Sequence, residues 1–227
     1  MFDDAGVMVS TVWAEAERLR MLYIGWNRGA SVPFRNAIGL ASSTDGGETF
    51  TREFRGPVVD RSIWDPSFVA SPFVLVEVDG YRLWYLSCTE WFSAGDSLMH
   101  RYHIKSATSK DAILWHRRGE VAIDFLDESE YAIARPWVVR TSAGLRMWFC
   151  ARGESYRVQS AFSSDGIRWT RDEHVSLDVS PTGWDSEMTA YPAVFDWRGM
   201  RYLLYNGNGY GRTGIGLAVL EDIGSAE

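Results

Sequence analysis

Residues 134–169 read ARPWVVRTSAGLRMWFCARGESYRVQSAFSSDGIRW, and this layout decides the fold. A short apolar stretch around a proline is followed by a turn that ends at Gly144. Two stretches of alternating polar and apolar residues come next, and a Ser-x-Asp-Gly turn then leads to Trp169. Alternation with a period of two places successive side chains on opposite faces, which is typical of β-strands. The segment therefore predicts a unit of antiparallel strands joined by tight turns.

The same layout occurs four times, at residues of about 5–53, 70–118, 134–171 and 190–220. Repeats of four antiparallel strands joined by such turns are typical of propeller blades. We predict an all-β protein, with residues 1–227 forming a single β-propeller domain in which four blades are visible. The segments expected as the innermost strands are residues 5–13, 70–78, 134–141 and 190–197.

The closure of the predicted ring has two solutions. The fourth repeat carries three strands up to Leu220, and only residues 1–4 precede the first repeat. The repeats therefore fit either a four-bladed ring or a five-bladed propeller without its first blade. Because exposed edge strands invite pairing with another chain, we expect either a homodimer that covers the open blade edge or an open, wedge-shaped molecule in which a blade is missing.

Composition and charge exclude several classes of protein. The 227 residues are 46% hydrophobic and 14% aromatic, which favours a folded globular chain. The net charge of −7 argues against nonspecific nucleic-acid binding, and no apolar run approaches the roughly 20 residues that span a membrane. The start, residues 1–4, lacks the features of a signal peptide, so a cytoplasmic protein is expected. The four histidines and two cysteines lack metal-ligand spacing, and we expect no metal and no cofactor.

The repeated elements resemble a known group of enzymes. The patterns x-Pro-x-Val, Gly-x-Arg-x-Trp-Tyr and Ser-x-Asp-Gly-x-x-Trp are similar to those of five-bladed propeller glycoside hydrolases of families 32, 43, 68 and 130. The stretches at residues 183–188 and 205–211 resemble a glycosidase-like branch associated with surface-sugar pathways. The resemblance covers the whole chain and implies a carbohydrate substrate or ligand.

The chain departs from the catalytic pattern of these families. Families 32 and 43 place an Asp directly before the blade proline, or a Glu two residues before it. Here the position before the proline holds Ser71, Arg135 and Tyr191, and the position before Val7 holds Gly6. The catalytic trio of the families is therefore not carried over.

A second resemblance concerns residues 43–50, which match the Asp-box of sialidases. That turn has a structural role and implies a propeller rather than a sialidase. A sialidase site would also need an arginine triad and a nucleophilic tyrosine, for which Arg35, Arg135, Arg157 and Tyr191 are the available residues.

Carboxylates just upstream of the first strands are the candidates for catalysis. Glycoside hydrolysis uses two carboxyl groups that flank the sugar bond, one of them held protonated. Glu130 and Glu187 stand at similar places before the third and fourth repeats, and Asp4 precedes the first. The alternative is that these acids cap turns or form ion pairs with neighbours such as Arg135.

The candidate substrate-binding residues are polar and aromatic side chains near the strand starts and after the second strands, where Tyr210 also stands. Aromatic rings stack on sugars, amides bind hydroxyl groups, and an arginine can hold an anion by bidentate hydrogen bonds. The candidates are Trp26, Asn27, Arg35, Ser71, Trp91, Arg135, Asp185, Tyr191 and Asn206. For the tryptophans the alternative is ordinary packing against a neighbouring blade.

Two functional hypotheses follow. The first is a glycoside hydrolase or transglycosidase, in which Glu130 and Glu187 are the acid/base pair and Asp4 is a third carboxylate. The second is a non-catalytic carbohydrate-binding or scaffold propeller, which the departure from the catalytic pattern favours. A pair of carboxyl groups about 5–10 Å apart would favour the enzyme.

Overall fold

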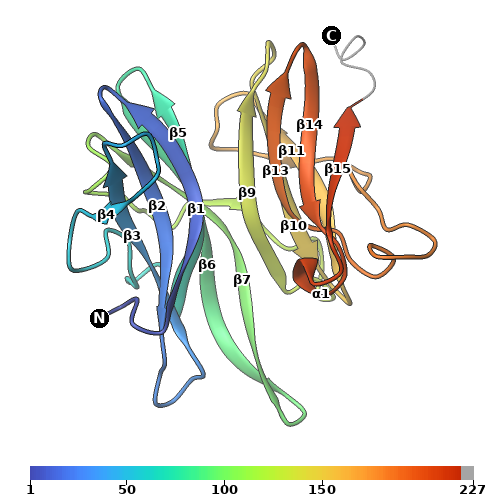
Figure 1. Ribbon diagram of the computed structural model, residues 1–227. Helices are drawn as coiled ribbons and strands as arrows, with labels where there is room; N and C mark the ends of the chain where they lie inside the picture. Colours follow the sequence, from blue (N-terminus) through green and yellow to red (C-terminus); the bar gives the residue numbers. More distant parts are fainter. Residues whose placement is uncertain (221–227) are drawn as a thin grey trace. The chain divides into compact units, whose positions relative to one another are not determined.

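The computed structural model describes residues 1–220 and is nearly all β, with one four-residue helical turn among those residues (Figure 1). The chain divides into two compact units, residues 1–122 and the residues from 123 onward.

The first unit contains two antiparallel groups of strands. The first group has the order β1-β2-β3-β4, with β1 (Gly6–Glu15), β2 (Arg18–Asn27), β3 (Arg35–Ser43) and β4 (Thr51–Arg52). The second group has the order β5-β6-β7, with β5 (Phe68–Glu77), β6 (Gly80–Ala94) and β7 (Ser97–Ser109). A single bridge between Thr108 and His116 stands where a fourth strand would begin. The short strand β8 (Val121–Ile123) lies at the boundary of the unit.

The second unit repeats this plan. Its first group has the order β9-β10-β11-β12, with β9 (Ala132–Arg140), β10 (Leu145–Arg152), β11 (Tyr156–Ser163) and β12 (Thr170–Arg171). Its second group has the order β13-β14-β15, with β13 (Ala190–Trp197), β14 (Met200–Asn206) and β15 (Ile215–Leu220). The helical turn α1 (Asn208–Gly211) connects the last two strands.

The predicted first, second and third strands of all four repeats are present. The segments expected as first strands correspond to β1, β5, β9 and β13. Their place at the centre of a ring, the number of blades, the single domain and the homodimer stay predictions. The short segment α1 is a tight turn rather than a regular helix, because Gly209 and Tyr210 both have a left-handed φ of 62°.

The repeated Ser-x-Asp turn forms as its chemistry predicts. The Ser163 hydroxyl accepts the N–H of Gly166 at 2.8 Å, and Asp165 accepts the N–H groups of Ile167 and Arg168 at 2.8 and 2.9 Å. These backbone hydrogen bonds hold the pKa of Asp165 well below its usual range. Ser109 and Asp111 build the same turn in the first unit. The turn is therefore structural in both units.

Each unit buries apolar side chains between its two groups of strands. In the first unit Leu22 and Leu40 pack with Val69, Val74 and Leu83. In the second unit Trp148, Val158 and Val194 form the corresponding cluster. Strands that are apolar on one face are stabilised by such face-to-face packing.

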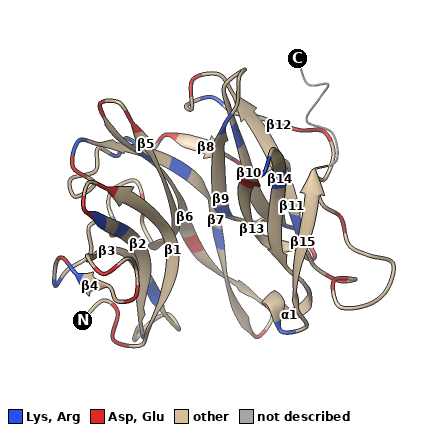
Figure 2. Ribbon diagram, turned by 45° about the horizontal axis from the view of Figure 1, so that its top comes forward, with Lys and Arg blue, Asp and Glu red and all other residues tan. Residues whose placement is uncertain are grey.

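Charged residues are dispersed in both units, as Figure 2 shows, with Lys and Arg interspersed among Asp and Glu. No helix among residues 1–220 is long and apolar enough to cross a membrane.

Candidate functional site

Most predicted site residues gather where the first strand of a repeat begins and the second ends. The register pairs Gly6 with Trp26, Ala132 with Arg152 and Ala190 with Asn206. We call this part of each repeat its entry edge. The entry edge of each repeat therefore brings together residues that are about 16–20 positions apart in the sequence.

Three of the first strands carry an unusual backbone conformation just inside the entry edge. Ser71, Arg135 and Tyr191 have φ values of 47°, 56° and 57°, and each precedes a proline. The pairing register breaks at the same places, so each strand carries a bulge there. The left-handed region is sparsely populated by residues other than glycine and costs of order 1–3 kcal/mol per residue.

Glycine would relieve this strain, yet none of the three positions holds one. Backbone strain of this kind clusters at functional sites, where it fixes the direction of a side chain. The side chains of Ser71, Arg135 and Tyr191 are therefore the candidates of the first strands that the backbone geometry favours.

In the second unit two of these side chains belong to a stack of rings and guanidinium groups. The guanidinium carbon of Arg135 lies 5.6 Å from the ring centre of Tyr191. The rings of Tyr191 and Tyr210 are stacked, with centres 5.9 Å apart and planes inclined by 27°. Arg152 donates a hydrogen bond of 2.9 Å to the hydroxyl of Tyr210. Arg135, Tyr191, Tyr210 and Arg152 thus form a continuous series, which we call the Arg–Tyr stack.

Neighbouring groups hold the stack in place. The buried ring of Tyr156 lies 6.2 Å from the rings of both Tyr191 and Tyr210. Asn206 donates to the backbone oxygen of Tyr210 at 3.0 Å and so fixes the loop that carries this ring. Asn206, expected to bind substrate, therefore has a positioning contact, and Tyr210 is the exposed ring of the stack.

Burial keeps the groups beside Arg135 protonated. It raises the pKa of the Cys150 thiol to about 12, although the Arg135 charge acts in the opposite direction. Burial also raises the pKa of the Tyr191 hydroxyl above its usual value. Since only a thiolate is nucleophilic, Cys150 is a packing residue at neutral pH.

The first unit has an open pocket at its entry edge. It has a volume of about 400 Å³ and is lined by Asp4, Ala5, Trp26 and Arg28. A volume of this size fits a small ligand. A Cβ atom added to Gly6 would lie 2.3 Å from the Trp26 indole nitrogen, so the glycine lets the ring lie flat on β1. The structure therefore brings together two predicted residues, Asp4 and Trp26.

Three other predicted residues of the first unit lie apart from this pocket lining. Asn27 lies opposite Arg35 across β2 and β3. Trp91 packs against Phe34 and His100, with ring centres 5.2 and 4.8 Å apart. Trp91 therefore has the packing role that was its alternative explanation.

The acids upstream of the first strands share a structural pattern that the strand repeats alone did not indicate. Asp3, Asp65 and Asp185 are buried, and each accepts a hydrogen bond from a tyrosine 20 residues later. These tyrosines lie in the second strand of each repeat and are Tyr23, Tyr85 and Tyr205. The constant spacing of 20 residues was the available signal. We call each such arrangement a carboxylate lock.

Glu130 occupies the corresponding place in the third repeat. Arg171 binds it through two hydrogen bonds of 2.6 and 2.8 Å, and the N–H of Leu126 adds a third of 3.0 Å. The residue at the tyrosine position is Phe149, over which the Arg171 guanidinium lies at 5.2 Å. Both Glu130 and Asp185 are thus engaged by internal partners.

Glu187 differs from these acids because it is exposed. Its backbone N–H donates to Asn208 at 2.8 Å, and its backbone oxygen accepts from Ser155 and Arg157. Arg157 also binds the Asp178 carboxylate at 3.0 Å, which gives this arginine of the sialidase-like triad a local structural partner. The catalytic roles of Glu130, Glu187 and Asp4 stay predictions.

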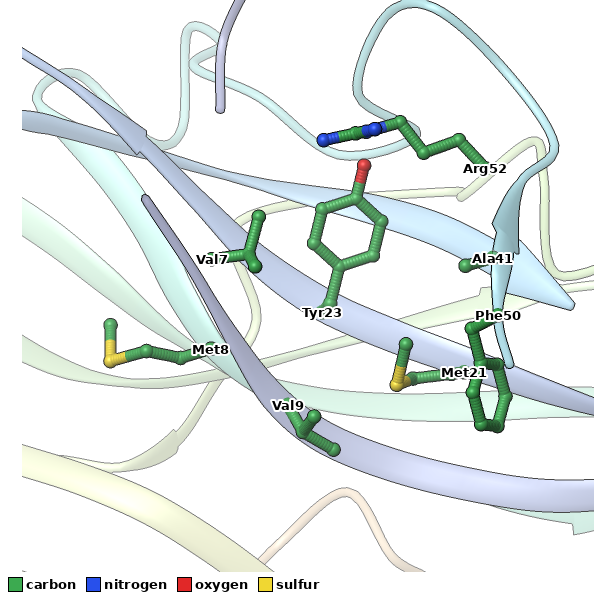
Figure 3. Close-up of a pocket in the computed structure, with 8 residues that line it drawn as sticks. All are labelled: Val7, Met8, Val9, Met21, Tyr23, Ala41, Phe50 and Arg52. Atoms are coloured by element: carbon green, nitrogen blue, oxygen red, sulfur yellow. The ribbon is translucent and has the colours of Figure 1, made fainter. Parts of the chain in front are cut away.

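A second pocket of the first unit lies on the outer face of β1, β2 and β3 and is shown in Figure 3. Its volume is about 170 Å³, and its lining is apolar except for Tyr23 and Arg52. Both polar groups bind the Asp3 carboxylate, at 3.1 and 2.6 Å. This pocket is therefore poorly suited to sugar hydroxyl groups. Among residues 1–220 no group of three or more His, Cys, Asp or Glu could hold a metal ion.

Comparison with known proteins gives two close relatives by sequence. Uncharacterized protein Rv1502 of Mycobacterium tuberculosis (strain ATCC 25618 / H37Rv) is 43% identical over 225 residues, which are 98% of this chain and 74% of the relative. Uncharacterized protein MT1551 of strain CDC 1551 / Oshkosh has the same identity and coverage. No family model matches the chain.

Solved structures resemble the chain at lower identity. A structure described as a BT0996 RGII complex has a TM-score of 0.76 at 18% identity, with coverage of 98% of this chain and 71% of the matched protein. A thermostable family-43 glycoside hydrolase has a TM-score of 0.74 at 15% identity, covering 93% and 70%. A family-130 structure, described with hydrolases that target β-1,2 mannosidic linkages in Candida mannan, has a TM-score of 0.63 at 19% identity, covering 88% and 59%. These likenesses show the fold, which is that of β-propeller glycoside hydrolases.

Proposed function

The chain belongs to the family of the Mycobacterium tuberculosis protein Rv1502, and we propose that it is a carbohydrate-active protein that contacts sugars at its entry edges. The observation that carries this proposal is the Arg–Tyr stack. It joins strained first-strand residues to an exposed ring, Tyr210, through stacked aromatic contacts. Aromatic faces provide apolar platforms for the C–H surfaces of sugars, and the neighbouring polar groups supply hydrogen-bond donors.

The pocket of Asp4, Trp26 and Arg28 supports the same proposal. It combines a ring, a carboxylate and a guanidinium group around a volume suited to a small ligand. A carboxylate accepts hydrogen bonds from sugar hydroxyl groups, and a guanidinium donates them. The pocket is thus a candidate sugar subsite of the first unit.

We propose glycoside hydrolysis or transfer as the activity, with Glu187 as the first carboxylate to test. Its side chain is exposed, whereas Glu130 and Asp185 are held by Arg171 and Tyr205. Glu130 is the second proposed catalytic carboxylate of the second unit, and Asp4 is the candidate carboxylate of the first unit.

The second candidate function is carbohydrate binding without catalysis. The internal partners of Asp65, Glu130 and Asp185 favour it, because they engage the buried acids that precede three of the first strands. The bidentate contact with Arg171 occupies both carboxylate oxygens of Glu130, which leaves them less available to a substrate.

A glycan array followed by hydrolysis assays on the bound sugars tests both functions. We expect Tyr210→Ala to weaken binding about tenfold, which corresponds to ~1.4 kcal/mol. Trp197→Ala is the matched control, because Trp197 is an exposed aromatic residue at the opposite end of β13. Equal loss of binding in both variants would contradict the proposed site.

The role of Glu187 is tested separately with Glu187→Gln. If the protein hydrolyses a bound sugar, this variant should retain binding and lose turnover. If the unsubstituted protein binds a sugar but does not hydrolyse it, the result would reject the enzyme hypothesis and support carbohydrate binding without catalysis. Unchanged turnover in the variant would remove Glu187 from the mechanism.

A further inference from the structure

The Arg–Tyr stack holds two cations at a site otherwise built from rings. Arg135 lies over Tyr191, and Arg152 lies 5.6 Å from the ring centres of both Tyr131 and Tyr156. Tyrosine rings attract cations through their electron-rich faces, so the stack is suited to holding positive charge. A neutral sugar would need the rings but not two guanidinium groups.

The position of Arg135 is the most informative feature. Arg135 stands at a bulge in β9 and has a left-handed backbone conformation. Glycine would adopt this conformation without strain. A strained backbone conformation at a residue with a long cationic side chain is a reason to look for a role of its charged group. Burial lowers the pKa of Arg135, because it takes the guanidinium group out of water.

The chemistry of guanidinium groups identifies the class of ligand. Their planar fork of N–H donors matches the two oxygens of a carboxylate or phosphate. An adjoining exposed ring, Tyr210, can support the sugar that carries this anion.

We propose that the Arg–Tyr stack recognises the carboxylate or phosphate of an anionic carbohydrate, with Arg135 as the anion-binding residue. This inference rests on the proposed carbohydrate function and adds the charge of the ligand to it. Arg152 is a positioning residue, because it donates its hydrogen bond to the hydroxyl of Tyr210 and so holds the ring on which the sugar would rest.

Binding measurements with matched pairs of sugars test the proposal. The pairs are an oligogalacturonate with the corresponding neutral galacto-oligosaccharide, and glucose 6-phosphate with glucose. We expect the anionic member of at least one pair to bind more than tenfold more tightly, with an advantage that shrinks as salt is added. The pair that shows the preference distinguishes a uronate from a sugar phosphate.

Three variants assign the preference to Arg135. Arg135→Gln should reduce the anionic preference at least tenfold and leave binding of the neutral partner nearly unchanged. Arg135→Gly should reduce the anionic preference to the same extent. Its melting temperature should equal or exceed that of the unsubstituted protein, because glycine tolerates the left-handed backbone. Arg168→Gln makes the same change of charge at an exposed turn and should leave the preference intact.

The outcomes separate this inference from the function on which it rests. Equal affinity for neutral and anionic sugars would overturn the inference and leave the carbohydrate function standing. An anionic preference that survives in both Arg135 variants would also overturn it. Failure to bind any carbohydrate would overturn both.

Discussion

Asp65 in the first unit and Glu130 in the second stand at the same place in their repeats, but different groups hold them. Asp65 accepts hydrogen bonds from Ser87 at 2.7 Å and from Tyr85 at 3.2 Å, and it pairs with Arg117 at 2.8 Å. Lys105 adds a second cation at 3.7 Å. Hydroxyl groups and cations together stabilise a carboxylate that has no exposed surface.

Glu130 is held without a tyrosine. Its longer side chain reaches Arg171 in a bidentate geometry, and the guanidinium lies on the ring of Phe149. The comparison teaches that the buried carboxylate before a first strand must have hydrogen-bond or ion-pair partners, but that the partners can differ between repeats.

Removing the charge of Asp65 should have the largest effect. Asp65→Ala would leave Arg117 and Lys105 without their shared carboxylate, and breaking a buried pair costs about 3–5 kcal/mol. Urea denaturation should show this loss in the free energy of unfolding. Asp79→Ala, at an exposed turn, is the control and should change stability by less than about 0.5 kcal/mol. Similar losses in the two variants would mean that the lock is not a stabilising element.

Tyr205 extends the comparison to the fourth repeat. Its hydroxyl donates to Asp185 at 2.8 Å, and burial together with this carboxylate raises the pKa of Tyr205 to about 12. Tyr205→Phe should cost about 1.5–3 kcal/mol at neutral pH, the range for a hydrogen bond to a charged group.

The pH dependence of Tyr205 has a definite sign. A raised folded-state pKa stabilises the fold below pH 10, the ordinary value for tyrosine, and this contribution is lost as the pH rises to about 12. The free energy of unfolding should therefore fall between pH 10 and 12, and the fall should be shallower in Tyr205→Phe. Identical slopes for the two proteins would contradict the lock in this repeat.

Exchanging the partners of Glu130 should sharpen the comparison. Glu130→Asp combined with Phe149→Tyr restores the pair of residues found in the other repeats. We expect the double variant to be about 1 kcal/mol more stable than the sum of the two single changes predicts, because residues in contact couple. Combining Phe149→Tyr with Asp178→Glu, whose carboxylate binds Arg157 elsewhere, provides the control. Additive effects in the first cycle would show that the two kinds of lock are not interchangeable.

The smallest expected effect is that of Ser71→Gly, at a residue whose left-handed conformation recurs at Arg135 and Tyr191. Ser71→Gly should leave stability unchanged or raise it by up to about 1 kcal/mol, since glycine adopts this conformation without strain. Ser71→Val should lower stability by about 1–2 kcal/mol, because a branched Cβ is disfavoured there. Thermal unfolding measures both, and the opposite order would argue against backbone strain.

The strands and turns could be predicted because their signals are local. Alternation along residues 145–149 and 201–205 indicates strands, and the Ser-x-Asp turns form from hydrogen bonds between residues only two to four positions apart. The predicted first, second and third strands of all four repeats are confirmed for this reason.

The candidate site was predicted only in part. Residue types pointed to Arg135, Tyr191 and the pair of Asp4 and Trp26. The left-handed backbone was not foreseeable, because a residue before proline ordinarily adopts an extended conformation. The sequence also could not show which acids are accessible to a substrate. Glu130 and Glu187 stand at similar distances from their strands, but Glu130 is buried and Glu187 is exposed.

The sequence by itself determined the repeated antiparallel strands and the turns that join them, because these depend on side-chain alternation and on contacts between near neighbours. The tertiary structure decided which carboxylates are held by internal partners and which rings stack beside Arg135. Those contacts join residues about 20–60 positions apart, as between Asp65 and Arg117 or between Arg152 and Tyr210. Such contacts form only when strands from different parts of a unit pack together, since burial and distance are properties of the folded chain.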